Sequence, residues 1–114
     1  MRREPRGINR MYIHAFLFRW VEGITEEQKK HVKQEILALQ GKIPGLLETH
    51  VGTNVSPRGK DYTFGGVMKF ADRAALDAYF PHPVHQALGE WLMPMIEPLE
   101  LDFDAASSTE KYSG

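Results

Sequence analysis

The predicted fold of this 114-residue chain depends on one stretch, Tyr79-Phe80-Pro81-His82-Pro83-Val84-His85. Its prolines fix their own φ and disfavour helical backbone in the residues before them, so one helix cannot run through the stretch. Pro83 suits the first position of a new helix, with His82 as its cap. The stretch also holds a tyrosine and two histidines, side chains that can transfer protons near neutral pH. It therefore predicts both a corner between two helices and a candidate site.

Helical patterns flank this corner on both sides. Asp72 is a good N-cap for a short helix that runs through Ala78 and ends at the corner. Beyond the corner, apolar residues recur at helical spacing, namely Leu88, Trp91, Leu92 and Met95. Nearer the N-terminus, a capping box with Thr25 as N-cap and Gln28 as the third helical residue begins another helix, which Gly41 is expected to end.

Four segments rich in β-branched and aromatic residues, or alternating in polarity, predict strands at residues 12–20, 46–55, 62–70 and 99–104. Both faces of the first strand are mostly apolar, so both are expected to be covered. The last strand alternates strictly, which predicts one buried and one polar face. Gly65-Gly66 in the third strand suggests a β-bulge or a space that is kept open.

The resulting order, β-α-β-β-α-β, predicts an α+β sandwich: a four-stranded antiparallel sheet with helices on one face and the second helix broken at the corner. The other face is left uncovered, and Leu47, Val51 and Val67 are expected to point toward it. A large apolar face in water would be exceptional. A second copy of the chain is expected to cover it, which predicts a homodimer through the open sheet face.

Composition narrows the class of protein. The length suits one domain, and a formal net charge of −1 gives no reason to expect nucleic acid or an anionic membrane as a partner. The absence of cysteine excludes disulfides and thiolate metal sites and fits a cytoplasmic protein. No apolar run reaches the roughly 18 residues that a membrane span needs. We expect an arginine-rich disordered leader at residues 1–10, with Met11 as an alternative start, a domain at 11–104 and a disordered tail at 105–114.

The ordered series of motifs resembles the stress-responsive dimeric A/B barrel family, known as Dabb domains. The matching pieces run from about Tyr12 to Asp104: Ile13-His14-Ala15-Phe16-Leu17-Phe18, Gly23-Ile24-Thr25-Glu26-Glu27-Gln28, Ile43-Pro44-Gly45, Val51-Gly52-Thr53-Asn54-Val55-Ser56, Asp61-Tyr62-Thr63, Tyr79 to Gln86, and Leu101-Asp102-Phe103. The resemblance implies a ferredoxin-like monomer and a dimer whose paired sheets form a barrel.

The resemblance also suggests a reaction. One plant member of the family closes a polyketide ring by aldol condensation, with a histidine base that a tyrosine assists. The shared Tyr-x-x-His-Pro-x-His pattern maps this pair onto His85 and Tyr79, and the first-strand histidine of that site onto His14. Phe64 and Ile36 stand where the cyclase has a further histidine and a further tyrosine.

Helical spacing turns His85 toward the sheet with Leu88 and Leu92, and His14 shares a strand face with Phe16 and Phe18. We therefore expect a cavity between the helices and the sheet, in which His85 and Tyr79 are the catalytic candidates. Its expected ligand-binding residues are His14, Phe64, Gly66, Trp91 and Leu92. The expected ligand is a small apolar or aromatic molecule, with no cofactor.

Alternatives remain for these side chains. His85 can be a core histidine that bonds to Tyr79 or to a backbone carbonyl and only holds the corner. A metal site at His82-x-x-His85 is not expected, because Pro83 keeps His82 out of the helix and no third ligand is evident. The sequence thus leaves open a ligand-binding protein without an assigned reaction, a cofactor-independent proton-transfer enzyme related to polyketide cyclases, and a non-catalytic scaffold domain.

Overall fold

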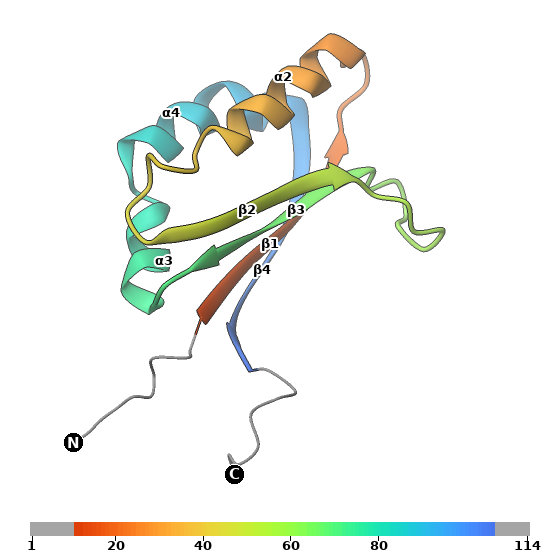
Figure 1. Cartoon of the computed structure of the whole chain (residues 1–114). Coiled ribbons are helices and arrows are strands. Elements are labelled where there is room, and N and C mark those ends of the chain that lie inside the picture. The colour runs from red at the N-terminus through yellow and green to blue at the C-terminus, as the bar shows by residue number, and fades with distance from the viewer. Residues whose placement is uncertain (1–10, 107–114) are drawn as a thin grey trace, which may run out of the picture.

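The computed structural model describes residues 11–106, which form one layer of sheet and one layer of helices (Figure 1). The elements follow one another as β1 (Met11–Trp20), α2 (Glu26–Leu37), β2 (Leu46–Thr53), β3 (Phe64–Phe70), α3 (Arg73–Tyr79), α4 (Pro83–Leu92), a short 3₁₀ turn (Met93–Met95) and β4 (Ile96–Ala105). The expected leader at 1–10 lies outside the described residues. So does the expected tail, except for its first two residues.

The four strands form one antiparallel sheet in the order β2-β3-β1-β4, and all three helices cover the same face (Figure 1). The predicted α+β sandwich is therefore confirmed. The strand ends differ by a few residues from the prediction. Tyr62 lies in the loop before β3, where the guanidinium of Arg19 sits 4.6 Å from the centre of its ring. Val55 lies beyond β2 and is exposed.

Local signals set the helix starts as the sequence predicted. The hydroxyl of Thr25 accepts from the Gln28 backbone N–H at 3.1 Å, while the Gln28 side chain accepts from the Thr25 N–H at 2.8 Å. The carboxylate of Asp72 accepts from the Ala75 N–H at 2.8 Å and caps α3. The end of α2 differs, because it stops at Leu37 and tight turns carry the chain on to Gly41, whose φ is +89°.

Gly65 and Gly66 do not form the expected β-bulge, whereas both line a hollow along the middle of the sheet. The register is continuous through both glycines, and the bulge of the sheet lies instead in β2, between Leu46 and Glu48. A Cβ on Gly66 would lie 2.3 Å from the carbonyl oxygen of His50 and 2.7 Å from both the Phe16 ring and the Val51 side chain. Gly66 therefore allows these groups to approach the backbone more closely than a residue with a Cβ would permit.

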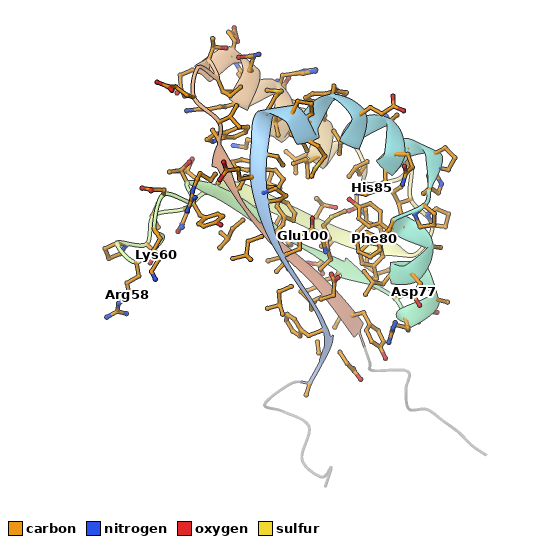
Figure 2. The ribbon with its side chains drawn as sticks, turned by 180° about the vertical axis from the view of Figure 1, so that it is seen from behind. Arg58, Lys60, Asp77, Phe80, His85 and Glu100 are labelled. Atoms are coloured by element: carbon orange, nitrogen blue, oxygen red, sulfur yellow. The ribbon has the colours of Figure 1, made fainter. Side chains whose placement is uncertain are left out.

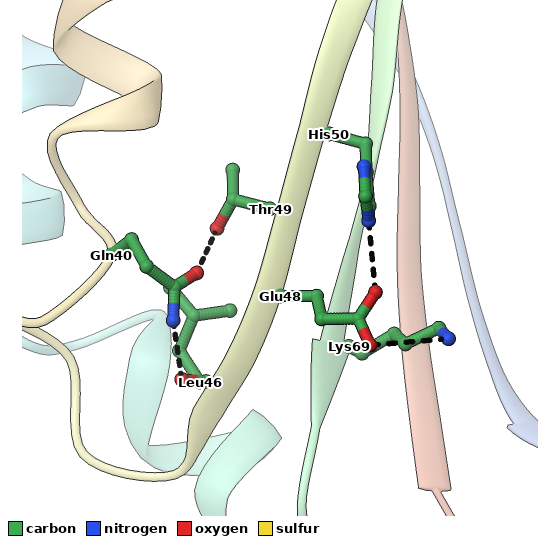
Figure 3. A network of polar contacts seen from close by, with 6 residues as sticks. All are labelled: Gln40, Leu46, Glu48, Thr49, His50 and Lys69. Atoms are coloured by element: carbon green, nitrogen blue, oxygen red, sulfur yellow. Dashed lines mark hydrogen bonds and ion pairs between the residues drawn. The ribbon is translucent and has the colours of Figure 1, made fainter.

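The pairing register divides the strand residues between the two faces. Val51 lies opposite Gly66, which lies opposite Phe16, so all three belong to the helix-covered face. The expectation that Val51 points to the open face is thus wrong, whereas Val67 does point there. Figure 3 shows the two sides of β2: Thr49 donates to Gln40 at 2.8 Å on the helix side, and Glu48 and His50 project to the other side.

The last strand also differs from the prediction that one of its faces is buried. Its apolar residues Leu99, Leu101 and Phe103 lie on the open face, opposite Leu17, Ala15 and Ile13 of β1, and are 54%, 59% and 42% exposed. The alternation is real, but the single chain does not bury the apolar side. The core lies on the other face, where Phe70, Met68 and Val32 are almost fully enclosed between sheet and helices.

Candidate functional site

A cavity of about 470 Å³ lies between α4 and the helix-covered face of the sheet. Most of its lining is apolar: Phe16 and Phe18 of β1, Met68 of β3, Ile36 of α2, Leu88 and Leu92 of α4, and Ile96 and Pro98 of β4. Three of the polar groups that line it are His14, Tyr79 and His85, which the sequence assigned to one cavity. Two of them, Tyr79 and His85, lie on either side of the corner between α3 and α4.

Side chains at the start of α4 hold the corner by bonding to the end of α3. Nδ1 of His85 lies 2.9 Å from the carbonyl oxygen of Phe80, and Nε2 of Gln86 donates to the same oxygen at 2.7 Å. Carbonyls at a helix C-terminus lack partners within their own helix, so these side chains satisfy one of them. His82 is the N-cap of α4, and its Nδ1 accepts from the Val84 N–H at 3.1 Å.

The bond to Phe80 also determines the state of the His85 ring. A carbonyl oxygen can only accept, so Nδ1 of His85 carries the proton. In the neutral imidazole Nε2 then has the lone pair, and within residues 11–106 that nitrogen has no hydrogen-bond partner. His85 thus has both a structural bond, as one alternative predicted, and a free basic nitrogen in a cavity.

Tyr79 lies beside His85, with 4.3 Å between the ring centroids and an angle of 52° between the ring planes. The tyrosine is buried at the end of α3. Burial raises the pKa of its hydroxyl well above the ordinary value, and the negative charge of Glu100 raises it further. The group is therefore a neutral phenol at physiological pH, able to donate a hydrogen bond to an oxygen of a ligand.

His14 faces these two residues from β1, with its ring centroid 5.8 Å from that of Tyr79. Its Nδ1 lies 2.6 Å from Oδ1 of Asp102 on β4, a pairing that the antiparallel register of β1 and β4 produces. An ionised carboxylate accepts only, so Nδ1–H of His14 donates to Asp102. This pair could not be predicted from the sequence, because its members are 88 positions apart.

The other expected ligand-binding residues divide into two groups. Leu92 lines the cavity, whereas Phe64, Gly66 and Trp91 are not among its lining residues. Phe64 packs on Phe18 and Trp20 at the far end of the sheet, and Trp91 stacks on His31 of α2 with 5.0 Å between the ring centroids. Sequence reasoning overlooked three polar groups of the lining, Gln86, Glu90 and Glu100. Alternation along the last strand separates Glu100 from Leu99 and Leu101, and the register with Phe16 places it on this face.

Other features of the described residues are less suited to chemistry. A hollow of about 590 Å³ lies along the middle of the sheet, where its lining includes Ala15, Leu17, Val67, Leu99 and Leu101 of the open face. No group of three histidine, aspartate or glutamate side chains within residues 11–106 is placed to hold a metal ion. None of the helices in this range is long and apolar enough to cross a membrane.

The cavity thus combines a lone-pair nitrogen, a neutral phenol and a carboxylate-paired imidazole around an apolar space. A basic nitrogen next to a phenol can remove a proton from carbon while the phenol hydrogen-bonds to the oxygen that gains charge. The same groups can also bind an aromatic molecule without reaction, since a few polar groups fix the orientation of a ligand in an apolar pocket.

The model of the stress-responsive A/B barrel domain (Dabb) family matches residues 13–105. A Dabb-family protein with a ferredoxin-like fold from Mesorhizobium loti is 27% identical, with a TM-score of 0.74 over 87% of this chain and 100% of its own. A dimeric ferredoxin-like protein of unknown function from Thermobifida fusca is 26% identical, with a TM-score of 0.74 over 84% and 92%. No curated protein sequence matches the chain.

A further solved structure shares the fold at lower identity. The hydroxynitrile lyase from Passiflora edulis has a TM-score of 0.79 over 86% of this chain and 95% of its own, with 17% sequence identity. At that identity the likeness is one of fold alone.

Proposed function

This chain belongs to the stress-responsive A/B barrel domain family, as its motifs predicted, and on that premise we propose that it is a homodimer that binds a small apolar or aromatic molecule in the cavity beneath α4. The observation that carries the proposal is the convergence of His14, Tyr79 and His85 on an apolar space of about 470 Å³. A packed core would fill such a space, because protein interiors contain few voids larger than a water molecule. Cytoplasmic location stays a prediction.

The dimer is supported by the open face of the sheet. Leu99, Leu101 and Phe103 form an exposed apolar row beside the hollow over the central strands. Exposed apolar patches of this kind mark interaction sites in soluble proteins. The relative from Thermobifida fusca is described as dimeric. We propose that two copies pack these faces together.

Binding is tested with a small aromatic ketone such as acetophenone, titrated into the protein and followed by NMR. The wild-type protein is expected to bind it, with shifts at the amides of α4 and β1. His85→Ala and Tyr79→Phe are expected to weaken binding, while His31→Ala, a histidine outside the cavity, is the control and leaves it unchanged. Equal binding by all four proteins would refute a role for the cavity.

A second function, proton transfer without a cofactor, is favoured by the state of the His85 ring. The bond from Nδ1 to the Phe80 carbonyl leaves the Nε2 lone pair available as a base, with the Tyr79 ring 4.3 Å away as the hydrogen-bond donor. A base at this position would remove the proton next to the carbonyl of a bound ketone, and Tyr79 would stabilise the enolate oxygen.

Exchange of the methyl protons of acetophenone into deuterated water reports this step directly. Loss of the base in His85→Ala should slow the exchange by about 10²-fold or more. If acetophenone binds but its methyl protons exchange no faster than in buffer, the hypothesis of proton transfer is wrong and the protein is a ligand-binding domain. Exchange that survives in both His85→Ala and Tyr79→Phe would place the chemistry elsewhere.

A further inference from the structure

The charges around the cavity have one sign. Two carboxylates line it from opposite walls, Glu90 on α4 and Glu100 on β4, and no lysine or arginine is among its lining residues. Both glutamates are exposed to solvent, which places them at the rim. A ligand that enters the cavity therefore passes two negative groups and meets no positive side chain that is permanently charged.

Glu100 belongs to the helix-covered face of the sheet, because it pairs with Phe16 of β1. Figure 2 shows it on the sheet below α4, with His85 and Phe80 to the side of it, and all three line the same cavity. Its negative charge acts on the buried part of the site as well, since it adds to the effect of burial in raising the pKa of Tyr79. The negative charge of Glu100 at the rim of the cavity thus acts on Tyr79 inside it.

The cationic side chains lie elsewhere on the described part of the chain. Lys29, Lys30 and Lys33 of α2 line a separate hollow that includes Trp20. Arg73 lines another hollow, on the far side of Phe80, and pairs with Asp77 at 3.1 Å. Arg58 and Lys60 lie in the loop between β2 and β3, well away from His85 in Figure 2.

From this arrangement we infer that the cavity selects its ligand by charge: it admits uncharged and cationic aromatic molecules and disfavours carboxylates. The inference rests on the proposed function and names the ligand class for that same cavity. A carboxylate would give up part of its hydration without finding a positive partner, and the two glutamates would repel it. An ammonium group on an aromatic ligand would be attracted by the same two charges. Water and salt screen exposed charges, so the discrimination is several-fold.

The test uses three probes of similar size and different charge: phenylpropanol, phenylpropylamine and phenylpropionate. Affinities are measured by NMR titration in low salt at about pH 8, where free imidazole is neutral and an alkylamine is still protonated. The carboxylate is expected to bind about fivefold more weakly than the alcohol, and the amine at least as tightly as the alcohol. Added salt should bring the three affinities together.

Variants of the two glutamates identify the source of the discrimination. Glu100→Gln and Glu90→Gln keep the side-chain shape and remove one charge each, and each should recover about two- to threefold in carboxylate affinity. Glu22→Gln makes the same charge change at an exposed residue in the turn after β1, and serves as the control without effect. Recovery in either cavity variant supports the inference, so one poorly folded variant does not remove the test.

Two results would overturn the inference, and they differ in what else they overturn. If the alcohol binds and the carboxylate binds equally well or better, the charge selection is wrong and the proposed cavity stands. If none of the three probes binds, the proposed function fails and the inference fails with it.

Discussion

Each face of the sheet carries one histidine paired with a carboxylate, and the two pairs lie in opposite surroundings. On the helix-covered face, Nδ1 of His14 meets Asp102 at 2.6 Å and 6% of the histidine side chain is exposed. On the open face, Nε2 of His50 meets Glu48 at 2.9 Å and 66% of the histidine side chain is exposed. Glu48 is also 3.6 Å from Nζ of Lys69 (Figure 3).

The comparison shows that burial, and not pairing, separates a candidate site from a surface contact. Water and salt screen the His50 pair, so its charges have little influence on their surroundings. The His14 pair sits among Phe16, Tyr79 and Phe80, where electrostatic interactions are stronger and an unpaired group would be costly. The open face also carries apolar side chains that need a cover, whereas the other face already has its helices.

The largest expected effect concerns the open face of the sheet, which we propose a second copy of the chain covers. Leu101→Asp places a charge in the middle of the proposed dimer contact, where its desolvation has no compensation. The variant is expected to sediment as a monomer at micromolar concentrations, at which the wild-type protein is expected to be a dimer. Val55→Asp makes the same kind of change at a residue that is 90% exposed and off the strands, and should remain dimeric. A dimeric Leu101→Asp would move the contact to another surface.

Two adjacent residues of β3 allow the two faces of the sheet to be compared within one strand. Met68 points to the helices and is 1% exposed, while Val67 points to the open face and is 36% exposed. Met68→Ala should reduce the free energy of unfolding by about 2–5 kcal/mol, because it leaves a cavity in a closed core. Val67→Ala should cost about 1 kcal/mol, and only at protein concentrations that favour the dimer. Denaturant unfolding at two concentrations gives both values; equal costs in a monomer would contradict the assignment of faces.

Tyr79 gives the covered face a characteristic response to alkali. The folded protein holds the phenol proton more tightly than the unfolded chain, whose tyrosine has a pKa near 10.0. Above that pH the unfolded state loses the proton first, so stability falls by about 1.4 kcal/mol per pH unit until the folded-state pKa is reached. Tyr79→Phe should lose stability less steeply than the wild-type protein from about pH 10 upward. Identical slopes would mean that the hydroxyl is not buried, and Tyr62→Phe in the loop controls for loss of a hydroxyl.

The sequence predicted the parts of this structure that depend on a few adjacent residues. Thr25 and Gln28 begin α2, Asp72 begins α3, and Pro83 begins α4 after the cap by His82, because each signal acts within one helical turn. Tyr79 and His85 could be assigned to one space for the same reason, since the corner lies between them.

Features set by pairing across the sheet were harder to predict. A period of two separates the residues of β2 into two faces but does not say which face meets the helices, so the face expected for Val51 is wrong. The bulge between Leu46 and Glu48 depends on the partner strand in the same way. Asp102 and Glu100 lie near the site because of the register of β4 on β1. That register pairs residues more than 80 positions apart, so it could not be predicted from local sequence.

The smallest expected effects come from the two histidine–carboxylate pairs themselves. Asp102→Asn should reduce the free energy of unfolding by about 1 kcal/mol, because buried His14 loses a charged partner that is itself partly exposed. Glu48→Gln should reduce stability at neutral pH by less than Asp102→Asn does, because Glu48 and His50 are both largely exposed. The hydrogen bond from His50, and then the charge of Lys69, lower the pKa of the Glu48 carboxyl below its ordinary value. Its small contribution is therefore present above the unfolded-state pKa and is lost as the pH falls through the folded-state pKa. Denaturant unfolding at neutral pH and at about pH 3 compares the two variants, and a larger loss at neutral pH in Glu48→Gln would reverse the contrast between the faces.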